Sequence, residues 1–211
     1  MAESGTSLLR RHLPSLAFVG IAAAVLAVGA AAFIYLGVYN IAADAPHTRP
    51  VYWAIENLRE RSVEVRARGV QLPADIGSPT RLARGAGLYA EMCAGCHLAP
   101  GMAPTEISQG LYPPAPQLSR VHLRDPRAQF WTIKHGVKMT AMPAWGRTHG
   151  DALIWDMVAF VRKLPSLSPA QYQAMVQSAP AGHDEMMQSM PGMSHHEAPP
   201  AEAGHDERHA H

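Results

Sequence analysis

The most reactive side chains of this sequence stand together in one short motif. Cys93 and Cys96 are the two cysteines of the chain, and His97 follows the second of them directly. A lone Cys-x-x-Cys pair can be a redox dithiol or half of a zinc site, whereas Cys-x-x-Cys-His is the attachment signature of c-type haem. There is no second cysteine pair to complete a zinc site. The motif therefore predicts one covalent haem c, bound through both thiols, with His97 as an axial ligand of the iron.

A second axial ligand must come from residues downstream of this motif. The candidates are Met102, His122, His135, Met139, Met142 and His149. Met142 is favoured because Pro143 and Gly146 make its surroundings a constrained loop. A thioether ligand favours the reduced iron and raises the reduction potential. Met139, three residues upstream, remains the main alternative.

Helices on both sides should hold these residues in place. Residues 81–92 are predicted to form a helix that leads into the motif, and residues 151–164 to form the last helix of the domain. Between them, residues 130–138 begin as a short helix that breaks at Gly136. A domain of residues 81–165 is too small for a large hydrophobic core, so we expect a covalent haem to complete it.

The N-terminal part carries a long apolar run. No charged residue occurs from Leu13 to Tyr39, and at about 1.5 Å per residue this run can cross a hydrocarbon core of about 30 Å. We interpret residues 13–43 as a single transmembrane anchor. A cleaved signal peptide is the alternative, but signal cores are usually about 7–15 residues long.

The charges around this run predict its orientation. Arg10 and Arg11 precede the run and Asp44 follows it, which places residues 1–12 in the cytoplasm. The rest of the chain would then lie on the periplasmic side of a bacterial cytoplasmic membrane.

Residues 44–80 are predicted to contain an amphipathic helix and a linker. Pro50 suits the first turn of a helix, and Gly69 is a natural stop. One stripe of this helix holds Val51, Ile55, Leu58, Ser62 and Val65. We interpret the helix as packing on the haem domain or lying at the membrane surface. Docking of a membrane-bound partner is the alternative.

The sequence resembles the class I cytochrome c family over the predicted haem domain. Gly85, Tyr89 and Cys93, each four residues apart, resemble the first helix of that family, where a glycine and an aromatic residue pack against the last helix. Met157 and Phe160 stand at the packing positions of a similar last helix. The resemblance implies an all-α fold around one haem.

A further part of this resemblance concerns the loop before residue 120. The sequence Ala115-Pro116-Gln117-Leu118 resembles the loop whose proline carbonyl holds the proximal histidine at Nδ1. The resemblance therefore implies that Pro116 orients His97, although this chain has Ala115 where the family usually has glycine.

Over residues 20–175 the layout resembles a subgroup of bacterial membrane-anchored monohaem cytochromes. The resemblance rests on residues 39–43 and 51–53, on the haem motif continued to Gly101, and on residues 133–145. In that subgroup the methionine before Pro-Ala-Trp is the iron ligand, which implies this role for Met142.

The C-terminal tail, residues 166–211, is rich in methionine and histidine. A short helix is possible at residues 169–177, and from residue 179 the composition is typical of a disordered segment. Thioether and imidazole groups suit Cu(I) and Cu(II), and the tail offers His183, Met186, Met187, Met190, Met193, His195, His196, His205, His209 and His211. We expect this tail to bind copper; a solvated tail without a function is the alternative.

Together these features predict an electron carrier rather than an enzyme. It would pass single electrons between a redox donor and a redox acceptor outside the membrane. An electron-port subunit of a larger oxidase or dehydrogenase and a copper-handling protein are the alternatives. A formal net charge of +1 gives no reason to expect nucleic acid. Cations near the haem edge are expected to steer an acidic partner: Arg120, Arg124, Arg127, Lys134, Lys138 and Arg147.

Overall fold

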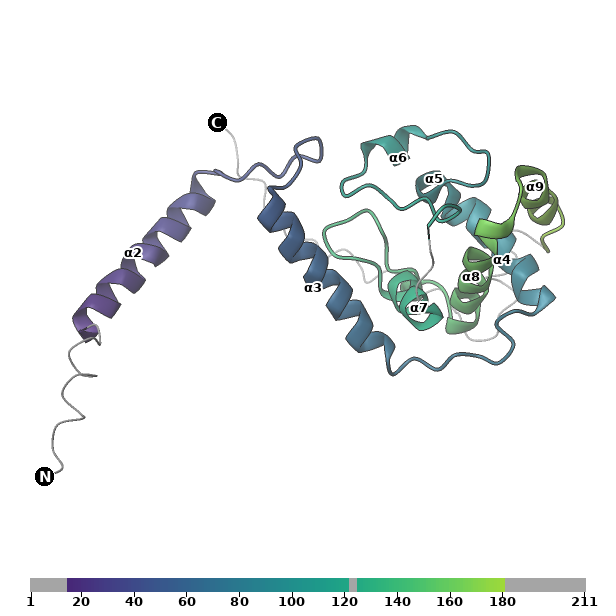
Figure 1. Ribbon diagram of the computed structural model, residues 1–211, viewed down its shortest axis with the longest axis horizontal. Helices are drawn as coiled ribbons and strands as arrows, with labels where there is room; N and C mark the ends of the chain where they lie inside the picture. Colours follow the sequence, from purple (N-terminus) through teal and green to yellow (C-terminus); the bar gives the residue numbers. More distant parts are fainter. Residues whose placement is uncertain (1–14, 122–124, 181–211) are drawn as a thin grey trace, which may run out of the picture. The chain divides into compact units, whose positions relative to one another are not determined.

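The computed structural model describes residues 15–121 and 125–180 of the 211-residue chain. Throughout these residues every regular element is a helix and no strand occurs, which confirms the predicted all-α fold (Figure 1). The chain divides into two compact units, residues 1–45 and residues 46–211, and each is described by itself.

The first unit contains the apolar helix α2, Leu16–Tyr35. Ser15 caps its N-terminus by accepting a hydrogen bond from the backbone N–H of Phe18 at 3.2 Å. The 20 residues of the helix correspond to about 30 Å, the thickness of a hydrocarbon core. Its length and apolar composition suit a membrane span, and a signal sequence would have the same properties.

Helix α2 ends before the apolar sequence does. Gly37 has a φ of +60°, and its N–H donates to the carbonyl of Ile34 while that of Val38 donates to Phe33. This pair of hydrogen bonds is a Schellman motif, which stops a helix at a glycine in the left-handed region. The helix is therefore shorter than the range 13–43 expected for the anchor.

The second unit holds the remaining helices. The α-helices are α3 (Arg49–Ala67), α4 (Pro79–Met92), α5 (Ala94–His97), α6 (Glu106–Gly110), α7 (Pro126–His135), α8 (Asp151–Lys163) and α9 (Pro169–Gln177), and two 3₁₀ turns, η1 and η2, cover Trp145–Arg147 and Leu164–Ser166. The sequence predicted α3, α4, α8 and α9 to within two residues at each end. Helix α7 starts four residues earlier than expected, because Asp125 caps it and Pro126 fits its first turn.

The core is built on the contact between α4 and α8. A Cβ at Gly85 would lie 2.1 Å from the carbonyl oxygen of Asp156 and 2.7 Å from Cβ of Phe160, so only glycine permits this approach. The rings of Tyr89 and Phe160 are 5.5 Å apart, and Met157 is completely buried. These contacts confirm the packing expected from the resemblance.

A buried ion-pair cluster also joins these two helices. Asp156 of α8 is fully buried, and its two carboxylate oxygens accept hydrogen bonds from Arg81 and Arg84 of α4, each at 2.7 Å. A buried carboxylate needs such partners because the interior solvates charge poorly. No pattern in the sequence predicted this cluster.

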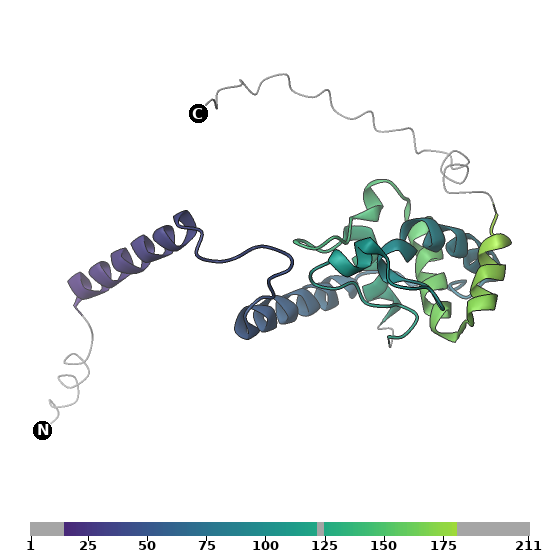
Figure 2. The same ribbon diagram turned by 90° about the horizontal axis from the view of Figure 1, so that it is seen from above.

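Helix α9 covers the far side of α4. The ring of Tyr172 lies 6.4 Å from that of Tyr89, and a capping box at Ser168 starts the helix. Figure 2 shows α9, in yellow-green, on the opposite side of the second unit from α3. Helix α9 packs on α4, whereas α3 packs on α7.

Helix α3 contacts α7 with a face that the sequence analysis did not expect. Its inward positions include Glu56, Arg59, Glu60 and Val63, which border a cavity described below. The apolar stripe expected to pack is instead largely exposed, and Leu58 reaches 72%. The helix does pack on the rest of the unit, but not with this stripe. That the stripe lies at a membrane surface or docks a partner stays a prediction. The side of α3 that faces the rest of the unit instead carries the charged residues Glu56, Arg59 and Glu60.

Candidate haem site

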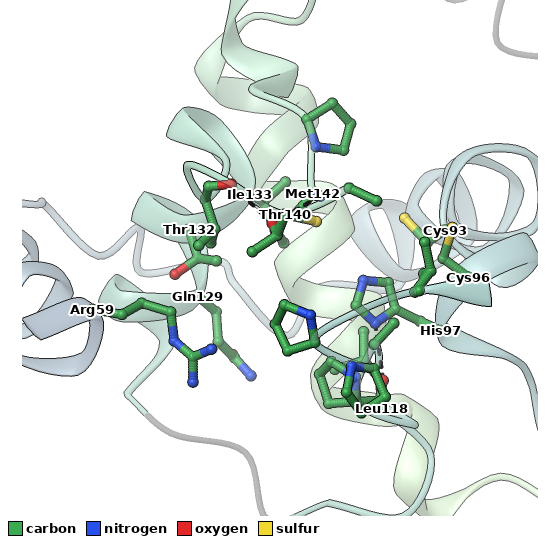
Figure 3. A pocket seen from close by; sticks show the side chains of 18 of the residues that line it. Arg59, Cys93, Cys96, His97, Leu118, Gln129, Thr132, Ile133, Thr140 and Met142 are labelled. Carbon is green, nitrogen blue, oxygen red and sulfur yellow. Dashed lines mark hydrogen bonds between the residues drawn. The ribbon is translucent and has the colours of Figure 1, made fainter. Parts of the chain in front are cut away.

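One cavity of about 550 Å³ in the second unit brings the predicted site residues together. Cys93, Cys96, His97, Pro116 and Met142 all line it, although they come from three separate parts of the sequence. Its walls also include residues of α3 and α7. Figure 3 shows the two cysteines and His97 on one side and Gln129 and Arg59 on the other. Cavities of about 300–1,000 Å³ are typical of cofactor sites.

The end of α4 and the single turn α5 set the geometry of the cysteine motif. Cys93 accepts hydrogen bonds at its carbonyl from the backbone N–H groups of Cys96 and His97, at 3.2 and 2.9 Å. This turn brings both thiols and the imidazole to the same part of the cavity (Figure 3). Both cysteines are free. Burial, with the nearby Cys96, raises the pKa of Cys93 to about 12, so this side chain is a protonated thiol at neutral pH.

His97 is oriented by the loop that follows α6. Its Nδ1 lies 2.9 Å from the carbonyl oxygen of Pro116, and because a carbonyl only accepts, Nδ1 is the donor. Burial lowers the pKa of His97 below its usual range, while this hydrogen bond acts in the opposite direction. A neutral imidazole with Nδ1–H bound to a carbonyl presents the lone pair of Nε2, the form that binds metals.

Met142 stands on a short loop braced against the end of α7. Gly136 has a φ of +65°, and a Cβ there would lie 2.7 Å from the carbonyl oxygen of Met142. That carbonyl accepts a hydrogen bond from Val137 at 3.2 Å. The hydroxyl of Thr140 donates to Val137 and accepts from the N–H of Met142. The loop thereby fixes the half-buried Met142 at the cavity.

A comparison with known protein families matches the region that carries this cavity. The model of the family described as cytochrome c oxidase, cbb3-type, subunit III, matches residues 80–161. Residues 80–161 are a c-type cytochrome domain. No curated protein and no solved structure matches the chain. A cytochrome c domain implies haem c and electron transfer.

The residues around the cavity fit haem c. Two free thiols are available for thioether bonds, and the neutral imidazole of His97 and the thioether of Met142 are both established types of haem-iron ligand. Most other lining side chains are apolar, as a macrocycle with an apolar face requires.

The other ligand candidates of the cytochrome domain do not line the cavity. Met139 is 90% exposed and Met102 is also exposed. His135 is exposed and lies 4.8 Å from the ring of Trp131. His149 is buried, but its Nδ1 contacts Thr148 and Trp145. His122 lies outside the described residues.

The α3 wall of the cavity was not predicted from the sequence. Tyr52, Glu56, Arg59, Glu60 and Val63 line it, and all of them precede the region that matches the family. A second helical stripe, next to the apolar one, holds Tyr52, Glu56, Glu60 and Val63 at spacings of four, four and three residues, with Arg59 beside it. That periodicity is visible in the sequence, but only the apolar stripe was predicted to pack.

Two of the expected steering cations of the cytochrome domain are paired with acids. Lys134 lies 2.6 Å from Asp151 and Arg127 lies 3.6 Å from Asp125, which weakens the positive field expected from them. Arg124 lies outside the described residues. The tail residues proposed for copper, from His183 to His211, also lie outside them.

Proposed function

We propose that this protein is a membrane-anchored monohaem cytochrome c that passes single electrons between redox proteins on the periplasmic side of a bacterial cytoplasmic membrane. The observation that carries the proposal is the single cavity lined by Cys93, Cys96, His97 and Met142. Haem c, when bound, supplies the one-electron iron couple.

Each residue has a distinct role in this proposal. Cys93 and Cys96 would hold the haem covalently, His97 and Met142 would be the axial ligands, and Pro116 fixes the orientation and protonation of His97. With a side chain at both axial positions, no iron position would remain open for a substrate. This supports a carrier rather than an enzyme.

The membrane anchor is proposed from α2. The helix is long and apolar enough to span a bilayer, and Arg10 and Arg11 on its N-terminal side favour a cytoplasmic N-terminus. The cytochrome domain and the tail would then lie outside the membrane. Because an anchored carrier meets partners in the same membrane, weak and brief contacts are sufficient for exchange.

A second candidate is an electron-port subunit of a larger oxidase. It is favoured by the description of the matching family, which names a subunit of a cytochrome c oxidase. The exposed apolar stripe of α3 would suit a permanent partner. Purification of the full chain in mild detergent distinguishes the two: a stoichiometric partner supports the subunit, and a monodisperse single protein supports the carrier.

Copper binding by the tail is proposed from its composition. Met187, Met190 and Met193 recur at every third residue among histidines and acids. Equilibrium dialysis of Cu(I) should show tighter binding by the full chain than by a chain lacking residues 179–211. Equal binding by the two chains would contradict copper binding by the tail.

Optical spectra of the membrane-bound protein test the central proposal. Wild type should show covalently attached haem c and, when oxidised, the weak long-wavelength band of methionine-ligated ferric haem. Met142→Ala should lose that band and lower the reduction potential, because the thioether stabilises reduced iron. Met139→Ala is the matched control and should keep both.

Two outcomes would contradict the assignment. If the band survives in Met142→Ala and disappears in Met139→Ala, the ligand is Met139. If no haem is covalently bound to wild type in cells able to mature c-type cytochromes, the haem site itself is wrong.

A further inference from the structure

Helix α3 places a charged face against the cavity of the cytochrome domain. Glu56, Arg59 and Glu60 all border it, and the apolar stripe of the helix stays outside. Arg59 and Glu56 are partly buried, 34% and 29% exposed, and partly burying charged side chains is unfavourable unless they meet polar groups. The occupant of the cavity should therefore be polar at this end.

Arg59 is the strongest candidate to meet such a group. Among the described residues that line the cavity, it alone is a lysine or an arginine. Its side chain is 34% exposed, and it forms an ion pair with Glu56, one turn earlier. A guanidinium has five N–H donors, so this ion pair leaves it able to bind a second carboxylate.

Gln129 of α7 adds a neutral donor to the same wall. Its Oε1 accepts a hydrogen bond from Arg162 at 3.3 Å. The amide N–H groups of Gln129 therefore point away from Arg162. Helices α3 and α7 are in contact. In the view of Figure 3 the side chains of Arg59 and Gln129 lie on the side of the cavity away from Cys93 and Cys96.

The chemistry of haem c relates these two sides. The cysteines bond to carbons of the former vinyl groups on one edge of the macrocycle, and two propionate carboxylates stand on the opposite edge. Attachment at Cys93 and Cys96 would therefore turn the carboxylates toward the wall that holds Arg59 and Gln129. Carboxylates inside a protein require charged or N–H donors.

We propose that Arg59 and the amide of Gln129 bind a haem propionate, which makes α3 part of the haem site although it precedes the matched cytochrome region. The inference rests on the proposed haem assignment. Arg59 is then a binding residue that also tunes the iron: its positive charge favours the ferrous state, and the negative charge of Glu56 opposes it.

Potentiometric titration of the full-length holoprotein in detergent tests this inference. Arg59→Gln should lower the midpoint potential, and Glu56→Gln should raise it. A general loosening of α3 would not produce shifts of opposite sign. The matched control is Arg61→Gln, which removes an arginine of the same helix that is 66% exposed and paired with Glu64 at 3.2 Å. Its potential should equal that of wild type.

Unchanged potentials in Arg59→Gln, or equal shifts in Arg59→Gln and Arg61→Gln, would overturn the inference. If Arg59→Gln does not accumulate as holoprotein, Arg59→Lys is examined by resonance Raman spectroscopy. A shifted propionate bending band supports the contact, and an unchanged band overturns it. Covalent haem and the methionine-ligation band are recorded for wild type, so failure of the haem assignment is seen separately from failure of this inference.

Discussion

The two walls of the cavity differ in chemistry, in position along the chain and in exposure. The wall formed by the cytochrome domain presents neutral sulfur and imidazole groups from Cys93, Cys96, His97 and Met142. The wall formed by α3 presents half-exposed charges and lies outside the region that matches the family. Under the two proposals above, the cytochrome domain would supply the bonds to the haem, and the upstream helix α3 would supply charges near it.

The largest expected effect concerns the contact between α4 and α8, which supports the wall formed by the cytochrome domain. Gly85→Val would place methyl carbons where α4 touches the backbone of Asp156. Neither the carbonyl nor Cβ of Phe160 can move aside independently, so α4 and α8 would separate. Because small domains are stable by only about 5–15 kcal/mol, we expect no haem-loaded protein to accumulate in membranes.

Gly77→Ala serves as the control for this prediction. An added Cβ at Gly77 meets nothing within 4 Å, so holoprotein levels should match wild type. Normal accumulation of Gly85→Val would show that the α4–α8 contact is not required to form the wall of the cytochrome domain.

The second-largest expected effect concerns Asp156, the buried carboxylate between α4 and α8. Asp156→Ala leaves Arg81 and Arg84 without their common carboxylate. Loss of one partner from a buried ion pair costs about 3–5 kcal/mol. Guanidinium unfolding of the holoprotein, followed by near-UV circular dichroism, measures the loss.

Another aspartate of α8 provides the matched control. Asp151 is 60% exposed and pairs with Lys134, so Asp151→Ala should cost at most about 1 kcal/mol. Similar losses for both variants would mean that the Asp156 cluster is far more hydrated than its burial indicates.

The smallest effect on stability is expected from a change in the exposed apolar stripe of α3. Leu58→Ser should change the free energy of unfolding by no more than about 0.5 kcal/mol, since Leu58 is largely exposed. Leu153, 2% exposed on α8, is the comparison, and Leu153→Ala should cost about 2–5 kcal/mol. A loss for Leu58→Ser as large as that for Leu153→Ala would show that a partner or another part of the chain covers the stripe.

The two walls also differ in how well the sequence predicted them. The residues proposed to bond to haem stand in a contiguous motif and a proline-glycine loop. Local patterns therefore identified Cys93, Cys96, His97 and Met142 as candidates. Helical periodicity located α4 and α8, and the glycine and aromatic spacing identified their contact. These features depend on neighbours in sequence.

The features that the sequence did not predict depend on contacts between segments far apart in the chain. An apolar stripe usually packs, but α3 turns Glu56, Arg59 and Glu60 toward the cavity, and no local pattern predicts that orientation. The burial of Asp156 depends on Arg81 and Arg84, more than 70 residues earlier, and no local pattern links them. Gly37 was a readable stop for α2, but apolar composition alone extended the expected segment past it.

The braced loop at Met142 has a consequence for the speed of electron exchange. Gly136 allows this loop to pass directly over the end of α7, and Val137 and Thr140 tie it at both sides of the methionine. With Met142 as the proposed ligand, its sulfur would hold nearly the same position in both oxidation states of the iron. A small rearrangement means a small reorganisation energy, so the loop would let each electron enter and leave without waiting for the protein to move.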